Sequence, residues 1–391
     1  MSPLMLTPAA ELADAEVDRG QRTTSTGRPA CRADRGRVAS ALARYQHSQS
    51  GYAILPGPAR HAVLEIGDRM QGLREALRPA EPPGSTHPGT DARSESLVAS
   101  ALRDAVDPYL DLLRGEIGFT APAPWRAASR YFHDRFGALI DLSPVAARCF
   151  RKPLGYAGDF EMMNMVYRNE SLGDTLFGRS LSRVVLDSDA GQAVRHRVQY
   201  LAGKIKAATA RVGPHRPARI LSVAAGPAME LQQLLRTDPA LIRAGRADIT
   251  LLDQDASALR HAREQITARA AQASAEITLR CLNTSIKAVI AQGLNGSYDL
   301  IYSAGLFDYL KDRTARAAGA RLVEALAPDG HAVIGNFAHA NPTRPLMELI
   351  LDWPLHHRSA SDLHQLFGDL GSGITIEQEA TGVNLFAVIS A

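Results

Sequence analysis

The stretch Arg219-Ile-Leu-Ser-Val-Ala-Ala-Gly-Pro-Ala-Met-Glu-Leu231 predicts the fold of the region around it. It starts with an apolar run typical of a buried strand, continues through the small residues of 224–228, and ends in a helical pattern. A strand, a tight turn and a helix in this order open a ligand site in many α/β domains. Small residues suit such a turn because a ligand can then lie against the backbone. The free N–H groups at the start of the helix favour polar or anionic ligand groups.

Downstream of this stretch, strand-like and helical patterns alternate. The strand-like runs are 219–223, 248–252, 276–282, 298–303 and 331–337, and the helical patterns are 228–236, 256–270, 284–292 and 314–327. Strands separated by helical crossovers predict a parallel sheet with both faces covered. Pro328-Asp-Gly330 predicts a turn before the fifth strand. Because only four residues separate the runs 374–379 and 384–390, the chain should end in a hairpin, which makes the last strand antiparallel.

Upstream of residue 211 the sequence predicts helices. Residues 1–35 have the composition of a disordered tail, and 79–90 that of a linker rich in proline and glycine. One expected helix face carries Leu97, Ala101, Val106, Leu110 and Leu113. We therefore predict a tail at 1–35, a mostly helical cap or substrate domain at 36–210, and an α/β domain at 211–391.

Composition and charge argue against several classes of partner. The 391 residues include 44 basic and 41 acidic side chains, so the net charge of +3 gives no global field for nucleic acid. The sequence contains no run of 18 apolar residues, so it does not predict a membrane span. The N-terminus lacks the pattern of a secretory signal. The three cysteines are far apart and form neither a metal-binding spacing nor a disulfide framework. We expect a cytoplasmic protein without a metal, and the sequence does not indicate its oligomeric state.

A second unusual segment, Arg151–Tyr167, combines two glycines, a proline, aromatic residues and two carboxylates. Asp159 fits the N-cap of a helix that starts directly after it. The alternative is the lip of an active site, in which Tyr156 and Asp159 face a ligand. Met162 and Met163 would then form an adaptable apolar wall.

The order of the predicted elements resembles the class I S-adenosylmethionine (SAM) methyltransferases, whose Rossmann-like sheet has seven strands with the last one antiparallel. Residues 220–228 resemble the first motif of the family, with Ser222 where an acid is common, and Leu251-Leu-Asp-Gln-Asp255 resembles the second. The resemblance implies that Asp253, at the end of the second strand, accepts hydrogen bonds from both ribose hydroxyls.

The same resemblance implies SAM as the cofactor and S-adenosylhomocysteine (SAH) as its product. The implied cofactor-binding residues are Ala224, Ala225, Gly226, Pro227, Glu230, Asp253, Gln254, Asn283, Ser303, Ala304 and Gly305. Alanine replaces glycine at positions 224 and 228, and we expect it to be tolerated because φ stays negative there. A dinucleotide-binding protein also uses a strand, a turn and an acid, but G-x-G-x-x-G is absent and the antiparallel end disfavours it.

A narrower resemblance covers about residues 150–391. It is carried by the segments Lys152–Glu161, Ser303–Tyr309, Gly335–Phe337, Asn341–Arg344, Asp352-Trp353 and Gly382–Phe386. These segments resemble the PhcB-type enzymes, which make 3-hydroxy fatty acid methyl esters used as quorum-sensing signals. The resemblance implies a small-molecule acyl substrate that is methylated on its carboxylate. The catalytic residues would be Tyr156, Asp159 and Tyr309, and the substrate-binding residues Met162, Met163, Tyr302, Asp308 and Arg344.

Several alternatives remain open at the level of the sequence. A carboxylate acceptor with a pKa of ~4.3 is ionised at pH 7 and needs no general base. A hydroxyl or phenol acceptor needs one, and Asp159, Asp308, His356 or His357 could serve, although the two histidines fit a solvated loop better. Arg344 could instead pair with Glu348, one helical turn on. The chain could also methylate another small-molecule hydroxyl or acid, or bind SAM as a sensor without turnover.

Overall fold

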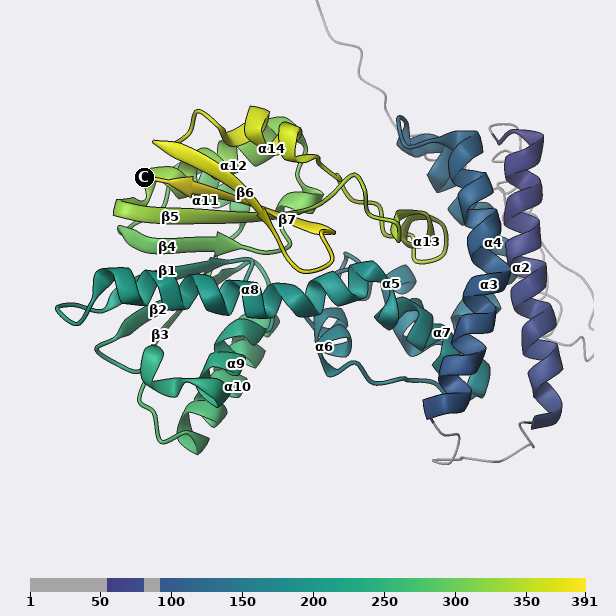
Figure 1. Ribbon diagram of the computed structural model, residues 1–391, viewed down its shortest axis with the longest axis horizontal. Coiled ribbons are helices and arrows are strands. Elements are labelled where there is room, and N and C mark those ends of the chain that lie inside the picture. The colour runs from purple at the N-terminus through teal and green to yellow at the C-terminus, as the bar shows by residue number, and fades with distance from the viewer. Residues whose placement is uncertain (1–54, 81–91) are drawn as a thin grey trace, which may run out of the picture. The chain divides into compact units, whose positions relative to one another are not determined.

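The computed structural model describes residues 55–80 and 92–391 (Figure 1). All the described helices and strands belong to one compact unit, which lies within Ser48–Ala391. The tail predicted at 1–35 and nearly all of the linker predicted at 79–90 lie outside the described residues.

A seven-stranded sheet forms the C-terminal part of this unit. Its strands are β1 (Ala218–Val223), β2 (Ala247–Asp253), β3 (Thr278–Asn283), β4 (Tyr298–Ser303), β5 (Leu326–Phe337), β6 (Gly373–Gln378) and β7 (Asn384–Ser390). They lie in the order β3-β2-β1-β4-β5-β7-β6. The first five strands are parallel, and β7 runs antiparallel to both of its neighbours. The predicted Rossmann-like sheet with an antiparallel last strand is confirmed.

Helices cover both faces of this sheet because neighbouring apolar residues of each strand point to opposite sides. The helices are α8 (Asp189–Val212), α9 (Met229–Thr237), α10 (Ala256–Gln272), α11 (Ile286–Gln292), α12 (Asp312–Glu324) and α14 (Ala360–Phe367). One core, around Ile220, joins the sheet to α8, α9 and α10. The other core, around Leu221, joins it to α11, α12 and α14.

The N-terminal part of the unit is helical, as predicted. It contains α2 (Gly57–Leu77), a 3-10 turn (Arg78–Ala80), α3 (Ala92–Ile117), α4 (Pro122–Ile140), α5 (Pro144–Arg151), α6 (Phe160–Arg168) and α7 (Leu176–Asp187). The predicted buried face of α3 is wrong at its start, because Leu97 is 72% exposed and Ala101 is also exposed. Val98 and Leu102 are buried there instead, since they continue the helical spacing back from Val106.

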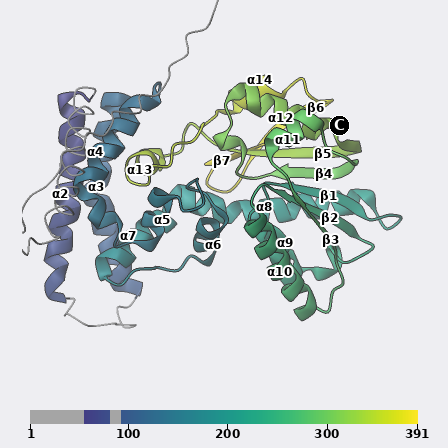
Figure 2. The ribbon, with the colours of Figure 1, turned by 180° about the vertical axis from the view of Figure 1, so that it is seen from behind.

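Two segments link the helical part to the sheet. The first half of α8 packs in the helical core and its second half packs on the sheet, so this helix joins the two parts, and the boundary predicted between 210 and 211 falls near its C-terminal end. The helix α13 (Arg344–Leu349) follows β5 in the chain but contributes Leu346 and Met347 to the helical core (Figure 2). None of the described helices is both long and apolar enough to cross a membrane.

The turn predicted at Pro328-Asp-Gly330 lies inside a strand rather than before it. The helix α12 ends at Glu324, earlier than predicted, and β5 begins at Leu326, which pairs with Tyr298. The pairing then jumps to Leu300 with His331, so the turn residues form a bulge in β5. Asp329 in this bulge has a φ of 61°.

Candidate active site

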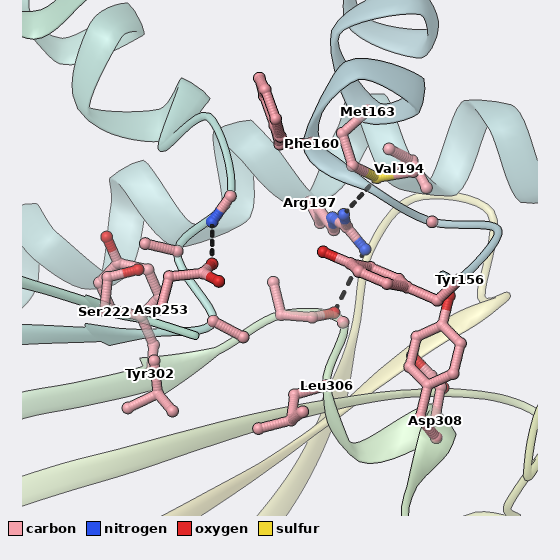
Figure 3. A pocket seen from close by; sticks show the side chains of 18 of the residues that line it. Tyr156, Phe160, Met163, Val194, Arg197, Ser222, Asp253, Tyr302, Leu306 and Asp308 are labelled. Carbon is pink, nitrogen blue, oxygen red and sulfur yellow. Dashed lines mark hydrogen bonds between the residues drawn. The ribbon is translucent and has the colours of Figure 1, made fainter. Parts of the chain in front are cut away.

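A cavity of about 510 Å³ opens where the chain leaves the carboxyl ends of β1, β2 and β4 (Figure 3). Strand β1 is paired with β2 on one side and β4 on the other, so this is the point at which the strand order reverses. Open α/β sheets bind ligands at such a point. The helical part closes the cavity through the segment 154–167 and α8. Its volume lies in the usual range for small-molecule sites.

The loop after β1 forms the floor of the cavity through Ala224, Ala225 and Gly226, whereas Pro227 does not line it. The expectation that φ stays negative at the alanines is wrong. Ala224 has a φ of 53° and Ala228 a φ of 49°, on either side of Gly226 at 53°. The left-handed conformation costs an alanine roughly 1–2 kcal/mol. Such strain persists only where the surrounding structure enforces it, which is typical of functional sites.

Asp253 joins the loop after β1 to the loop after β2. Its Oδ2 accepts a hydrogen bond from Gly226 N at 2.9 Å, as Figure 3 shows, and its Oδ1 accepts one from Asp255 N at 2.9 Å. Burial raises the pKa of Asp253, and these two N–H groups oppose the rise. Each carboxylate oxygen keeps a second lone pair, so Asp253 can hold both loops and still accept hydrogen bonds from a ligand.

The loops after β3 and β4 differ in part from the sequence prediction. Asn283 does not line the cavity, because its Nδ2 donates to the carbonyl oxygens of Asp253 and Gln254. Gln254 itself lines the cavity, and Thr284 and Ile286 lie where Asn283 was expected. After β4 the lining residues include Ala304 and Gly305. Ser303 is buried with no partner for its hydroxyl and does not reach the cavity.

A buried arginine that the sequence analysis missed lies in the wall of the cavity. Arg197, on α8, is 7% exposed. Its Nη1 donates to Ala304 O at 3.2 Å, and its Nη2 contacts Met163 Sδ at 3.3 Å and Tyr167 Oη at 3.4 Å (Figure 3). Its Nε has no partner, and no described carboxylate forms an ion pair with it. The sequence does hold one indication of this residue, because Arg197 interrupts the apolar face that Val194, Val198 and Leu201 form on the helix.

Glu230 is a second buried charge in the same cavity. It is 5% exposed, and its Oε1 accepts a hydrogen bond from Tyr302 Oη at 2.7 Å, which accounts for the buried hydroxyl of Tyr302. Burial raises the pKa of Glu230, while the bond from Tyr302 and the charge of Arg197 oppose the rise. The charges of Glu230 and Arg197 each affect the pKa of the other group, yet neither side chain forms an ion pair within the described part of the chain. Buried charges without partners are costly, so a ligand that carries both signs fits the space they share.

Two tyrosines, Tyr156 and Tyr309, also line the cavity. The rings of Tyr156 and Tyr309 meet edge to face with centroids 6.1 Å apart. Tyr309 keeps 36% exposure, but its hydroxyl accepts a hydrogen bond from Trp353 Nε1 at 2.9 Å and lies against Gly158, where a Cβ would come within 2.6 Å. Burial is the main cause that raises the pKa of both phenols, so both stay protonated at neutral pH. Their hydroxyls can therefore donate hydrogen bonds but cannot act as bases.

Asp159 caps α6 and does not face the cavity. Its Oδ1 accepts a hydrogen bond from Met162 N at 2.9 Å, and its carboxylate pairs with Arg148 at 2.9 Å. It is fully buried and is not part of the lining. The capping interpretation is confirmed, and we drop Asp159 from the catalytic candidates because both of its oxygens are engaged elsewhere.

Of the other residues predicted to bind the substrate, some line the cavity and some do not. Met163 lines the cavity, but Met162 is buried in the helical core, with its sulfur 3.5 Å from Cys149 Sγ. Arg344 lies outside the cavity, where it pairs with Glu348 at 2.7 Å and stacks on Phe119. The alternative interpretation of Arg344 is therefore confirmed.

Asp308 lines the cavity beside Tyr309 and is 3% exposed. Its Oδ1 accepts a hydrogen bond from Phe337 N at 2.6 Å. Burial raises the pKa of Asp308 to about 6, opposed by that hydrogen bond and by the charges of Arg197 and Arg358. Within the described residues, Phe337 N and the N–H of Asp308 itself bind this carboxylate, and it forms no ion pair.

The two histidines considered as bases lie outside this cavity. His356 is exposed, as expected for a solvated loop, but His357 is 6% exposed and its Nε2 lies 3.2 Å from Asn341 Nδ2. Burial lowers the pKa of His357 to about 3. The expectation of a solvated His357 is wrong because the segment around it packs under α13 and β5.

Residues 221–332 match a family model described as a methyltransferase domain. This match, the sheet order and the cavity at the reversal of that order support SAM-dependent methyl transfer as the activity of the C-terminal part of the chain.

Comparison with solved structures gives similarities at low sequence identity. The chain is similar to a possible exported protein from Bordetella parapertussis, with 15% identity over 86% of this chain and 99% of that one and a TM-score of 0.47. It is also similar to magnesium protoporphyrin IX methyltransferase from Synechocystis PCC 6803, with 15% identity over 62% and 98% and a TM-score of 0.44. A third similarity is to the N-methyltransferase NodS from Bradyrhizobium japonicum WM9, with 17% identity over 49% and 86% and a TM-score of 0.34. A search of proteins with curated descriptions found no match.

Proposed function

We propose that this methyltransferase O-methylates the carboxylate of a 3-hydroxy fatty acid and so forms a methyl ester of the kind used in quorum sensing. The observation that carries the proposal is the pair of protonated phenols, Tyr156 and Tyr309, whose rings meet edge to face in the lining of the cavity. Two hydroxyl donors suit a carboxylate. The apolar side chains of Phe160, Met163 and Leu355 in the same lining suit an acyl chain.

The proposed position of SAM follows from the charges in the cavity. Asp253 accepts hydrogen bonds from the ribose hydroxyls, and the small residues of 224–226 let the ligand approach the backbone. Arg197 binds the carboxylate of the amino-acid head, and Glu230 binds its ammonium group. A zwitterionic head supplies a counter-charge to each of these buried side chains.

The residues of this chain act mainly by positioning. SAM supplies an electrophilic methyl group, and the acceptor acid is already ionised at neutral pH, since carboxylic acids have pKa values of ~4.3. Tyr156 and Tyr309 orient the carboxylate through their hydroxyls, and the apolar wall excludes water. Alignment of this kind can contribute up to ~10 kcal/mol to catalysis.

The proposal extends to the cytoplasm as the location. Cys149 and Cys281 are free thiols in the structure, which suits a reducing compartment.

The direct test is product analysis. Purified protein, SAM and a panel of fatty acids and 3-hydroxy fatty acids are incubated, and mass spectrometry measures the gain of one methyl group. Fragmentation then distinguishes a methyl ester from a methyl ether, and we expect the ester. Binding of SAM without any methylated acid would contradict the proposal and favour a sensor.

A second candidate function rests on Asp308. A cavity-lining carboxylate with a pKa of about 6 has the properties of a general base, which a hydroxyl acceptor requires. In that case the product is an ether. The value of kcat/KM then falls as the pH drops through about 6, because protonated Asp308 cannot accept the proton.

Removal of one phenolic donor tests the acceptor end. We expect Tyr156→Phe to lower kcat/KM for the acid by about 10-fold or more, because a hydrogen bond to a carboxylate is lost. The affinity for SAH, measured by calorimetry, should not change. The matched control is Tyr109→Phe, which removes a hydroxyl outside the cavity. Normal turnover by Tyr156→Phe would exclude that hydroxyl from a role in acceptor binding.

A further inference from the structure

Asp308 is held rigidly in the wall of the cavity. It lies in the 3-10 turn Phe307–Tyr309 that follows β4. Its Oδ1 accepts a hydrogen bond from Phe337 N at 2.6 Å, and its carbonyl oxygen accepts one from His356 N at 2.7 Å. The side chain is therefore fixed from β5 and from the segment after α13. Its position does not depend on a ligand.

The charge of this carboxylate has no direct partner in the described residues. The charges of Arg197 and, less strongly, Arg358 act on Asp308, but neither forms an ion pair with it. Arg358 pairs instead with Asp312 at 2.8 Å. A buried carboxylate that only two backbone N–H groups bind keeps lone pairs that a ligand can use. A neighbouring hydrogen-bond donor is therefore expected from the bound acceptor.

The chemistry of the neighbouring residues defines that donor. Tyr156 and Tyr309 stay protonated at neutral pH, so each can donate a hydrogen bond to the carboxylate of the acceptor. Asp308 can only accept when ionised, so it suits a group that carries a proton. Arg197 already places a positive charge in this cavity, and a neutral hydroxyl therefore fits better than a second cation.

We propose that the carboxylate of Asp308 accepts a hydrogen bond from a hydroxyl that the acceptor carries near its own carboxylate, so that Asp308 selects hydroxy acids over unsubstituted acids. This inference rests on the proposed carboxyl methylation. The inference assigns the preference for hydroxy acids to Asp308. The fold and the two phenols do not account for this preference.

The test compares three acids of equal chain length: the 3-hydroxy acid, the unsubstituted acid and the freshly prepared 3-oxo acid. For the wild type we expect kcat/KM for the hydroxy acid to exceed the other two by about 10- to 100-fold, the range for a hydrogen bond to a charged group. In Asp308→Asn the amide oxygen keeps the bond from Phe337 N and the amide N–H₂ faces the cavity. The variant then offers a donor, so the ratio of hydroxy acid to 3-oxo acid should fall by at least about 10-fold.

The matched control is Asp369→Asn, which alters an exposed carboxylate that pairs with Arg316 and does not line this cavity. It should leave the ratios between the acids unchanged. Melting curves and SAH affinity check that Asp308→Asn folds. If it does not fold, the preference of the wild type among the three acids still tests the proposal.

The outcomes separate the two proposals. A wild type that methylates acids without preferring the hydroxy acid would overturn the role of Asp308 and leave the proposed function intact. An equal fall in activity on all three acids in Asp308→Asn would also overturn it, because that pattern indicates a structural or general-base role. A wild type that methylates none of the acids would remove both proposals.

Discussion

Substitution of Arg197 by methionine is expected to weaken SAH binding by about 100-fold or more and to leave the binding of 5′-methylthioadenosine within about threefold. The second ligand has the same nucleoside and sulfur but lacks the amino-acid head. Calorimetric titration of the wild type and the variant with both ligands gives the difference directly.

The physical reason is the isolation of the Arg197 guanidinium. It is buried on α8 with one carbonyl, one thioether and one phenol as neighbours, and its Nε has no partner. The carboxylates of Asp308 and Glu230 act on it through their charges without forming an ion pair, so the carboxylate of the amino-acid head would be its direct counter-charge. Methionine fills a similar volume in the apolar stripe, so we expect the helix to pack as before.

The control is Arg211→Met on the same helix, which removes a guanidinium bound to Asp299 O outside the cavity. It should change neither affinity. Glu230→Gln should also weaken SAH more than 5′-methylthioadenosine. An equal loss for both ligands in Arg197→Met would contradict the assignment to the amino-acid head and indicate a general disturbance of the cavity.

The second large effect is expected for Asp253→Ala, which should weaken SAH and 5′-methylthioadenosine alike, by about 100-fold or more. Both ligands contain the ribose that Asp253 is proposed to bind. The free energy of unfolding should also fall by about 2–3 kcal/mol, because the N–H groups of Gly226 and Asp255 lose their acceptors. Denaturant titration measures this second effect.

Asp255→Ala separates the two consequences. Asp255 caps α10 by accepting from Ser257 N and does not line the cavity, so its removal should lower stability without a large change in affinity. A 2′,3′-dideoxy form of 5′-methylthioadenosine provides the ligand control. If Asp253→Ala weakens this form as much as the parent compound, Asp253 does not bind the ribose hydroxyls.

The local patterns of the sequence were sufficient for the sheet and for the loops at its carboxyl ends. Alternating apolar runs and helical stripes predict the strands because burial on a sheet or a helix follows a fixed period. The small residues at 224–226 and the acid at 253 line the cavity because they directly follow β1 or end β2. The same local rules failed where a backbone conformation was strained, as at Ala224 and Ala228, since periodicity carries no information on φ.

The partners of buried polar groups were decided only by the tertiary structure. The sequence of α8 does not reveal that Arg197 meets Ala304 from the loop after β4, 107 positions away, or that Tyr302 meets Glu230 from α9. Asp159 was predicted in the site and is instead held by Arg148, whereas Asp308 lines the cavity and only backbone N–H groups bind its carboxylate. Charge pairing depends on which elements the fold brings together, and hydrophobic periodicity records only that a face is buried.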